Sequence, residues 1–383
     1  MSTLNTSINT VNSLPTPALL LDKIALERNI QTMQQRMAQL GVSLRPHLKT
    51  AKSATIARLA TAGQAGGITV STLREAEYFF EHGVRDLLYA IGIVPGKLDA
   101  VTALTRRGAD MKIITDNDTA ARAIADYARR HDASFKVMIE IDSGGRRAGV
   151  LPDSDALLAI GHILQQAPGV ELIGVLTHAG HSYHCHTADA IQEVARQERD
   201  AIVLAAERLR AAGLPCPVVS AGSTPTACLA EDLTGVTEMR PGVFVFYDLD
   251  QLAIGVCRRQ DLALSVLASV IGHNRHAGHL ILDAGALALS KDISAQEFRT
   301  DVGYGELCDS TTQAVLPGLY VQSVSQEHGL VPVSDPDWYD RLPVGAKVRI
   351  LPNHACITAA AYDGYQVLEG STVVAQWDRV NGW

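Results

Sequence analysis

Residues 67–91 read GITVSTLREAEYFFEHGVRDLLYAI, and three segments follow one another within them. Gly67–Ser71 is a short, apolar, partly β-branched run of the kind that forms a buried strand. Thr72–Gly83 has helical periodicity and begins with Thr72 and Glu75 at the spacing of a capping box. Asp86–Ile91 is a second apolar run and predicts a second strand. A strand, a helix and a strand with short connections predict two parallel strands covered by a helix.

The same alternation continues over residues 18 to about 250. The clearest further helices are predicted at Asp118–His131 and Ala188–Ala212. Five more apolar runs predict strands, at Ala18–Leu21, Lys112–Thr115, Phe135–Ile141, Glu171–Thr177 and Pro217–Ser220. This number of strand–helix units favours a (β/α)8 barrel over an open sheet, and we expect the barrel to span residues 15–258.

Helical periodicity ends near residue 258. Beyond it, strand-like runs alternate with turns rich in proline, aspartate and glycine. These runs are Leu262–Gly272, His279–Asp283, Gly318–Val324, Ala346–Leu351 and Tyr365–Leu368. We expect residues 259–383 to form a second, mostly β domain, with the N-terminal residues 1–14 as a candidate addition to it.

The composition argues against several classes of function. The 383 residues carry 33 basic and 41 acidic side chains, a formal charge of −8, and no long Lys/Arg block that would follow a nucleic-acid backbone. No stretch approaches the roughly 18 apolar residues of a membrane span, and the N-terminus lacks the pattern of a secretory leader. The six cysteines are too sparse for a disulfide scaffold. We therefore expect a cytoplasmic protein with a small-molecule partner.

A basic segment follows the first part of the predicted barrel. Residues 42–52 read VSLRPHLKTAK and place Arg45, His47 and Lys49 at alternate positions. An extended backbone would point all three side chains to one side. Neighbouring cations disfavour the ammonium form of a lysine, and the neutral amine can attack a carbonyl to form a Schiff base. A solvated basic strand end is the alternative interpretation.

A candidate anion site follows a later strand. The sequence Val218-Val-Ser-Ala-Gly-Ser-Thr-Pro-Thr226 takes an apolar run into Gly222, Ser223 and Thr224, with a proline suited to a first helical turn. Free backbone N–H groups and hydroxyls at such a turn can bind a phosphate ester. No P-loop or G-x-G-x-x-G pattern competes with it, so the turn suggests a small phosphorylated cofactor. An ordinary helix N-cap would need no ligand.

A candidate metal pair lies near the C-terminus. His354 and Cys356 are two residues apart, which on a strand places both on one face, and imidazole nitrogen with thiolate sulfur suits Zn²⁺. The alternative is a cysteine buried as a small apolar residue. Two further groups follow predicted strands. One is Arg147 in a glycine-rich loop, for which a surface salt bridge is the alternative. The other is a second ligand cluster or part of the barrel-mouth lining, at His178, His181, Tyr183, His184, Cys185 and His186.

Together these features resemble the alanine-racemase-like class of pyridoxal-phosphate enzymes, and within it the D-serine dehydratase and D-threonine aldolase family. The resemblance runs almost from end to end of the chain. The motifs that carry it are Thr16-Pro-Ala-Leu-Leu-Leu-Asp22, Arg45-Pro-His-Leu-Lys-Thr-Ala-Lys-Ser53, Ile139-Glu-Ile-Asp142, Gly222-Ser-Thr-Pro-Thr226, Arg240-Pro-Gly-Val-Phe-Val-Phe-Tyr-Asp248 and Pro352-Asn-His-Ala-Cys356. Jointly they are specific, although each alone is not.

The resemblance implies a role for each matching residue. Lys49 would be the catalytic residue and would hold pyridoxal 5′-phosphate as a Schiff base, with Arg147 beside the cofactor ring. His354 and Cys356 would bind the metal, which is Zn²⁺ in the dehydratases, with Mn²⁺ or Mg²⁺ as alternatives. The other expected cofactor-binding residues are His178, Tyr183, Gly222, Ser223, Thr224, Gly242 and Tyr247.

The implied activity is a metal-dependent lyase that eliminates water from a D-β-hydroxy amino acid. The candidate substrates are D-serine, D-threonine and D-threo-3-hydroxyaspartate, and the products would be a 2-keto acid and ammonia. His184 departs from the dehydratase pattern and leaves an aldolase that cleaves the Cα–Cβ bond as the alternative. Small non-catalytic pyridoxal-phosphate carriers resemble the barrel alone, so the β domain argues against that class. The family also implies a homodimer.

Overall fold

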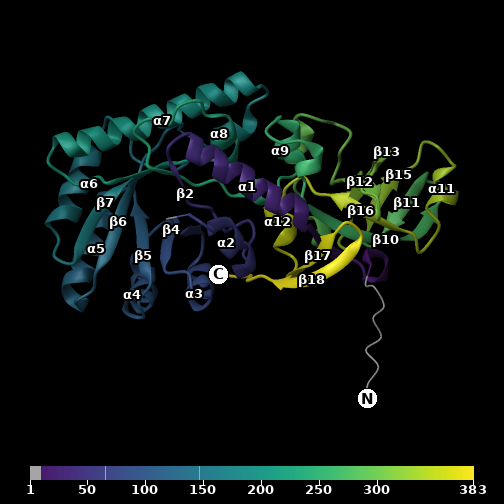
Figure 1. Ribbon diagram of the computed structural model, residues 1–383, viewed down its shortest axis with the longest axis horizontal. Helices are drawn as coiled ribbons and strands as arrows, with labels where there is room; N and C mark the ends of the chain where they lie inside the picture. Colours follow the sequence, from purple (N-terminus) through teal and green to yellow (C-terminus); the bar gives the residue numbers. More distant parts are fainter. Residues whose placement is uncertain (1–9, 65, 146) are drawn as a thin grey trace, which may run out of the picture. The chain divides into compact units, whose positions relative to one another are not determined.

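The computed structural model describes residues 10–64, 66–145 and 147–383, which divide into two units. The β unit contains the chain up to Asn29 together with Val245–Arg379, and the barrel unit contains Ile30–Phe244 with Val380–Trp383. Both predicted architectures are present: eight parallel strands form a curled sheet in the barrel unit, and a ten-stranded sheet forms the β unit (Figure 1). The fold is alanine-racemase-like.

The barrel strands follow one another along the sheet in the order β2-β9-β8-β7-β6-β5-β4-β3. Their bounds are β2 Ser43–Leu44, β3 Ile68–Val70, β4 Asp86–Gly92, β5 Asp110–Thr115, β6 Phe135–Glu140, β7 Val170–Leu176, β8 Val218–Ala221 and β9 Glu238–Met239. Backbone hydrogen bonds join the two ends of this sheet, because the Thr69 N–H donates to Pro46 O at 2.9 Å and the Leu48 N–H donates to Thr69 O at 2.8 Å. These bonds close the barrel directly before Lys49.

Helices cover the outside of these strands, with α7 along the top and α5 and α6 at the left in Figure 1. The helices of this part of the chain are α1 Lys23–Gln39, α2 Ala54–Thr61, α3 Leu73–Glu81, α4 Leu98–Arg106, α5 Asp118–His131, α6 Asp155–Gln166, α7 Ala188–Ala211 and α8 Thr224–Leu229, with 3-10 turns η2 Pro95–Lys97, η3 Gly180–His184 and η4 Val243–Val245. Helix α3 begins as its sequence predicts. The Glu75 N–H donates to Thr72 Oγ1 at 3.0 Å, and the Ser71 N–H donates to Glu75 Oε2 at 2.9 Å.

The interior of the barrel is layered. A cluster of buried apolar side chains fills the middle: Leu88, Ile114, Met138, Ile173 and Leu176. At the strand N-termini the interior is charged, because Arg45 donates to Asp86 Oδ1 at 2.7 Å and to Glu238 Oε2 at 2.7 Å, and Lys112 donates to Asp86 at 2.6 Å. Burial raises the pKa of Asp86, but the hydrogen bonds from Arg45 and Lys112 outweigh it and hold the pKa below its usual value.

The sheet of the β unit has a long path in the order β13-β12-β16-β10-β1-β17-β18, with β11, β14 and β15 beside it. The strands are β1 Ala18–Asp22, β10 Leu264–Asn274, β11 His279–Leu282, β12 Glu306–Asp309, β13 Val315–Tyr320, β14 Ser323–Val324, β15 Gly329–Pro332, β16 Lys347–Leu351, β17 Gly364–Glu369 and β18 Thr372–Asp378. Short helices connect them: η1 Val11–Ser13, α9 Leu249–Ala253, η5 Arg259–Asp261, α10 Ala286–Leu289, η6 Ser294–Glu297, α11 Trp338–Arg341 and α12 Ala355–Ala359.

One strand prediction is wrong. The run Ala18–Leu21 does not form a barrel strand, because β1 pairs antiparallel with β10 and parallel with β17. Leu19, Leu20 and Leu21 are almost fully buried, so the strand is covered on both faces. A strand buried on both faces reads as the same continuous apolar run in either sheet, and its sequence therefore gives no information on its partners. The first barrel strand is β2 instead.

The unit boundaries also differ from the predicted ranges 15–258 and 259–383. The segment from residue 15 to Asn29 groups with the β unit, and so does the segment from Val245 to residue 258. The described part of residues 1–14 lies against the β sheet, since the Val11 N–H donates to Ser371 O at 2.9 Å and Lys347 Nζ donates to Leu14 O at 2.5 Å. Residues 1–9 lie outside the described residues.

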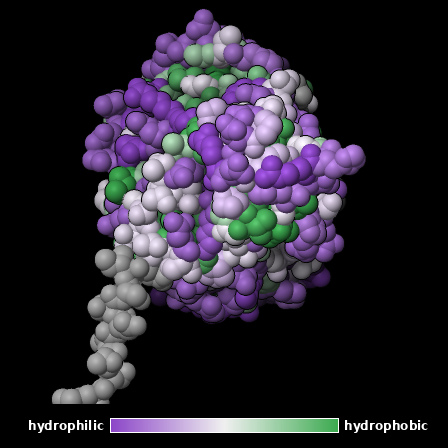
Figure 2. Space-filling view, turned by 90° about the vertical axis from the view of Figure 1, so that its right-hand side faces the viewer, coloured by the Kyte–Doolittle hydropathy of each residue, from purple (hydrophilic) through white to green (hydrophobic). Residues whose placement is uncertain are grey.

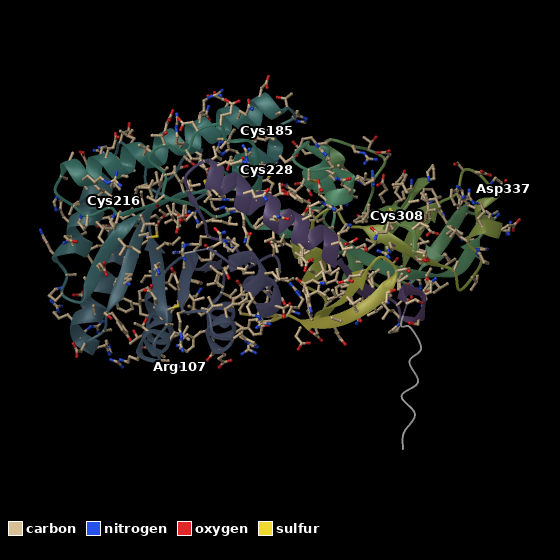
Figure 3. The ribbon with its side chains drawn as sticks, viewed as in Figure 1. Arg107, Cys185, Cys216, Cys228, Cys308 and Asp337 are labelled. Carbon is tan, nitrogen blue, oxygen red and sulfur yellow. The ribbon has the colours of Figure 1, made fainter. Side chains whose placement is uncertain are left out.

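Two surface properties bear on the predicted class. Among the described helices, none combines the length and the apolar character needed to span a bilayer. On the face that the β unit presents in Figure 2, hydrophilic residues cover most of the surface and apolar residues form small separate patches. No disulfide joins any of the six cysteines, all of which lie in the described chain, and the four that Figure 3 labels lie in different segments.

The cap of α3 provides a test of the fold. Replacing Thr72 with alanine removes the side-chain acceptor of the Glu75 N–H, and we expect it to lower the free energy of unfolding by about 1 kcal/mol in urea titrations. The matched control is Ser154→Ala at the N-cap of α6, where the side chain makes no capping bond and the expected change is within about 0.5 kcal/mol. Equal losses in the two variants would contradict the assigned cap.

Candidate active site

The carboxyl ends of the barrel strands bring several predicted residues together. Lys49 lies in the turn after the bridge that closes the barrel, and its charge acts on the rings of both His47 and His178. His178 follows β7, and its Nδ1 donates to the carbonyl of Gly222 at the end of β8, at 3.1 Å. Arg240, just after β9, contributes a second positive charge beside both histidines. Four segments distant in sequence therefore meet at one end of the barrel.

Both histidines are neutral at physiological pH. Burial and the neighbouring Lys49 ammonium lower the pKa of His178 to about 3. Burial, Lys49 and Arg240 also lower the pKa of His47 well below its usual value. Because a carbonyl oxygen can only accept, the proton of His178 is on Nδ1, and its Nε2 is an acceptor. The site thus contains uncharged imidazoles among fixed cations.

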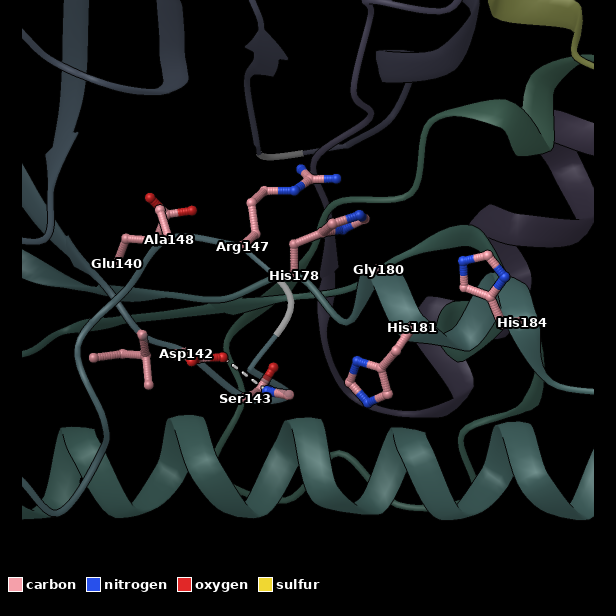
Figure 4. Close-up of a pocket in the computed structure, with 11 residues that line it drawn as sticks. Glu140, Asp142, Ser143, Arg147, Ala148, His178, Gly180, His181 and His184 are labelled. Carbon is pink, nitrogen blue, oxygen red and sulfur yellow. Dashed lines mark hydrogen bonds between the residues drawn. The ribbon is translucent and has the colours of Figure 1, made fainter. Parts of the chain in front are cut away.

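A cavity of about 250 Å³ opens at the loops after β6 and β7 (Figure 4). Its polar lining includes Glu140, Asp142, Arg147, His178, His181 and His184. Figure 4 shows the guanidinium of Arg147 beside the ring of His178. Gly180 lies beside both side chains, since a Cβ there would be at ordinary contact distance, 3.7 Å, from Arg147 Nη2 and from His178 Nε2. The ring of Tyr183 lies near by, with its centroid 6.4 Å from that of His178.

The predicted anion site is an internally bonded turn. Ser223 and Thr226 form a capping box, in which the Thr226 N–H donates to Ser223 Oγ at 3.2 Å and the Ser223 N–H donates to Thr226 Oγ1 at 3.0 Å. The Ser223 hydroxyl also meets the Ser182 hydroxyl at 2.8 Å. Gly222 adopts φ +114°, a conformation that favours glycine. By contrast, the Thr224 hydroxyl is buried without a hydrogen-bond partner.

The other expected cofactor residues lie in different units. Gly242 belongs to the barrel unit, where a Cβ on it would lie 3.1 Å from the backbone oxygen of His47 and 3.2 Å from Thr50 Oγ1, so only glycine leaves this space open. Tyr247 belongs to the β unit, where it is buried and adopts φ +47°. Its part in a cofactor site stays a prediction.

Arg45 does not join Lys49 as an alternating strand would require. The extended backbone of β2 ends at Leu44, and the guanidinium of Arg45 pairs with Asp86 and Glu238 in the charged layer of the barrel interior. Arg45 is 5% exposed, and burial of its charge is tolerated because two carboxylates compensate it. The expectation that Arg45, His47 and Lys49 share one side is therefore wrong for Arg45.

The candidate metal pair is in the β unit, and its local structure differs from the prediction. His354 is the N-cap of the short helix α12, and Cys356 lies in its first turn, so the pair is not on a strand. The side chains nevertheless meet, because His354 hydrogen-bonds with Cys356. Asp292 Oδ2 accepts from His354 Nδ1 at 3.1 Å, which leaves Nε2 as the nitrogen available to a ligand.

The surroundings of His354 favour a positive charge. Burial lowers its pKa, but the Asp292 carboxylate and Cys356 outweigh burial and raise the pKa to about 11.

A second ligand cluster is not present: in the part of the chain that the structure describes, no three His, Cys, Asp or Glu side chains converge as metal ligands. The cluster predicted at residues 178–186 instead contributes His178, His181 and His184 to the cavity wall.

Sequence reasoning missed three residues that shape these sites: Glu198, Arg240 as a charge beside the histidines, and Asp292. Glu198 had a detectable signal, because it is the one acidic residue on a face of α7 whose other buried members are apolar. Asp292 had none, since its contact with His354 spans 62 residues.

In comparisons with known proteins, two family models match two successive parts of the chain. The family model of the alanine racemase N-terminal domain matches residues 21–250, and that of a putative serine dehydratase domain matches residues 263–368. A D-threo-3-hydroxyaspartate dehydratase from Delftia is 50% identical over 98% of this chain and 100% of its own length. A D-serine dehydratase from Dictyostelium discoideum is 30% identical over 97% of this chain and 98% of its own.

Solved structures give the same picture. The Delftia dehydratase superposes with a TM-score of 0.95 at 49% identity, covering 98% of this chain and 100% of that one. A D-threonine aldolase from Filomicrobium marinum superposes with a TM-score of 0.83 at 27% identity, covering 97% of both chains. The dehydratase and aldolase activities are thus both found on this fold.

The depressed pKa values predict how stability depends on pH. The unfolded chain binds protons at His47 and His178 below pH about 6.5, whereas the folded, cofactor-free protein does not until a much lower pH, so stability falls as the pH is lowered from 6.5. His178→Gln removes one of the two groups. We expect its urea midpoint to fall less steeply than that of the wild type between pH 6.5 and 4.5. Parallel curves would contradict a neutral His178 in the folded state.

Proposed function

The chain belongs to the alanine racemase N-terminal domain family, here joined to a serine dehydratase domain, and we propose that it is a lyase that removes water from a D-β-hydroxy amino acid. Its relatives include dehydratases of D-threo-3-hydroxyaspartate and D-serine. The single observation that carries the proposal is the 50% identity to the first of these over 98% of the chain. Of D-serine, D-threonine and D-threo-3-hydroxyaspartate, the last is therefore the first substrate to try.

The barrel mouth, which is the end of the barrel at the carboxyl ends of its strands, fits pyridoxal 5′-phosphate. Thr224 offers a buried hydroxyl without a protein partner, and Gly242 leaves open a space that a Cβ would fill. Lys49 would hold the cofactor covalently, the turn formed by Gly222, Ser223 and Thr224 would hold its phosphate, and Arg147 would lie beside its ring, with His178, Tyr183, Gly242 and Tyr247 around it. When bound, this cofactor supplies an electron sink for the carbanion formed at the substrate Cα.

The side chains of the barrel mouth would take up protons and provide positive charge. Lys49 Nζ would be the base that takes the proton from the substrate Cα once the amino group of the substrate has displaced it from the cofactor, because it is the amine whose charge acts on both histidines at the barrel mouth. His178 is neutral and offers Nε2 as an acceptor, since its Nδ1 is bound to Gly222. Arg147 and Arg240 supply positive charge that attracts the anionic groups of substrate and cofactor.

The β unit fits a divalent metal. His354 Nε2 and the Cys356 thiolate are a nitrogen and sulfur donor pair of the kind that selects Zn²⁺ over Mn²⁺ or Mg²⁺, and nearby carboxylates favour a cation at this position. Solved structures of D-threo-3-hydroxyaspartate dehydratase include a metal-free cysteine-to-alanine variant and a histidine-to-alanine variant. Those two residues are two positions apart, as His354 and Cys356 are here. A bound zinc ion supplies a Lewis acid for the departing hydroxyl.

A second function has one observation in its favour. His184 lines the cavity, and a histidine in this region is the feature by which the sequence departs from the dehydratases. An aldolase would release glycine and an aldehyde instead of ammonia and a 2-keto acid. For either reaction we propose a homodimer, on the resemblance to the family, and a cytoplasmic location, on the composition of the sequence.

The substrate and the metal can be tested together. Zinc-loaded protein is incubated with each of the three D-amino acids, and ammonia, keto acid and glycine are measured. We expect ammonia and keto acid, fastest from D-threo-3-hydroxyaspartate. Chelation of the metal or Cys356→Ala should reduce the rate of ammonia release at least ~100-fold, because the leaving hydroxyl then lacks its Lewis acid.

The control is Cys257→Ala, which removes a cysteine of the same unit outside the proposed metal site and should keep full activity. The absorbance of the bound cofactor should be unchanged in both variants, since the proposed cofactor contacts do not include either cysteine. Glycine as the product would replace the dehydratase with the aldolase. Full ammonia release by metal-free protein, verified by elemental analysis, would exclude a role for the His354–Cys356 pair in the reaction.

A further inference from the structure

Helix α7 carries one charged residue on its buried face. The other buried residues of this face are apolar, namely Ile191, Val194, Ala195, Ile202, Ala205, Ala206 and Leu209, whereas Glu198 is acidic and only 1% exposed. A carboxylate in such a place is strongly destabilising unless polar groups of the protein replace its hydration. Its position therefore requires partners that compensate the lost water.

Three hydrogen bonds compensate the burial of Glu198. Its Oε1 accepts from the backbone N–H of Ala179 at 2.8 Å and from that of Gly222 at 3.1 Å. Its Oε2 accepts from the Thr226 hydroxyl at 2.8 Å. Burial raises the pKa of Glu198, while these donors oppose the rise. The three donors come from two segments, the loop after β7 and the Gly222–Thr226 turn after β8.

Both segments carry part of the proposed cofactor site. Ala179 directly follows His178, Gly222 begins the candidate phosphate turn, and Thr226 closes the capping box of that turn with Ser223. Gly222 is held from both sides, because its N–H donates to Glu198 and its carbonyl accepts from His178 Nδ1. One carboxylate thus fixes the loop after β7 relative to the loop after β8.

These contacts also determine which donors face a ligand. The Gly222 N–H is taken by Glu198, and the Ser223 N–H is taken by Thr226. The Thr224 hydroxyl is the buried polar group of the turn to which the structure gives no partner. With those two N–H groups bonded within the protein, the Thr224 hydroxyl is the group of the turn that the structure leaves for a ligand.

We propose that Glu198 is a positioning residue for the cofactor: it orients His178 and the Gly222–Thr226 turn from behind, and through them it sets the affinity for the phosphate of pyridoxal 5′-phosphate. Glu198 does not touch the cofactor itself. This inference rests on the proposed function, because it takes the turn to be the phosphate site. It predicts that the reach of the side chain matters more than its charge.

The test compares four proteins in their affinity for pyridoxal 5′-phosphate, measured by absorbance titration. Glu198→Gln keeps the acceptor for both backbone N–H groups, and we expect its dissociation constant to stay within about threefold of the wild type. Glu198→Asp keeps the charge but is one methylene shorter and cannot reach all three donors. Glu198→Ala removes the acceptors altogether. For both of these variants we expect at least tenfold weaker binding.

The matched control is Ile202→Ala, one turn further along the same buried face. It creates a cavity and lowers the melting temperature, but it removes no hydrogen bond to the turn, so we expect cofactor affinity within about twofold of the wild type. A second readout uses the cofactor-free proteins. The amides of Ala179 and Gly222 should exchange with deuterium faster in Glu198→Asp than in Ile202→Ala, because they have lost their acceptor.

Two results distinguish failure of the positioning role from failure of the proposed function. If the wild type binds pyridoxal 5′-phosphate and Glu198→Asp binds it equally well, the positioning role is wrong while the proposed function stands. If the wild type does not bind the cofactor, the proposed function and this inference fail together. Should Glu198→Ala not fold, Glu198→Asp, Glu198→Gln and Ile202→Ala still separate these two results.

Discussion

The closure of the barrel constrains every other part of the candidate site. Two backbone hydrogen bonds join residues 46–48 to Thr69 and turn an eight-stranded sheet into a closed ring. The strands at this seam are short, since β2 is two residues long and β3 is three, so ladder hydrogen bonds alone hold little of it. Arg45, directly after β2, pairs inside the barrel with Glu238 of β9 and with Asp86 of β4, which lies across the seam, and Lys49 follows the seam directly. The position of Lys49 follows from how the barrel closes.

The two ends of the barrel interior differ in how their charges are arranged. At the strand N-termini, acidic and basic side chains alternate and compensate one another, as Lys112, Asp86 and Arg45 do. The cluster of buried apolar side chains in the middle of the barrel lies between these ion pairs and the carboxyl ends of the strands. There burial and the charges of Lys49 and Arg240 keep His47 and His178 neutral. Fixed positive charge at this end suits anionic ligands, which a phosphorylated cofactor and a dicarboxylic substrate both are.

The sequence was informative where the signal is local. Long apolar runs predicted β4 to β8 nearly to the residue, and capping and periodicity located α3, α5 and α7. Two-residue strands such as β2 and β9 carry too little pattern to be detected, and Ala18–Leu21 would read the same in either sheet. The family resemblance identified the candidate residues, but not their supports. Glu198 and Asp292 act through contacts distant in sequence, which only the fold reveals.

The location of the covalent cofactor tests the assigned active site most directly. Protein saturated with pyridoxal 5′-phosphate is reduced with borohydride, digested and mapped by mass spectrometry. We predict a phosphopyridoxyl group on Lys49 and none on Lys52, whose ammonium is paired with Glu75 at 3.1 Å. A label on Lys52 or on another lysine, or no label in a saturated sample, would contradict the assignment of Lys49 and of the barrel mouth as the active site.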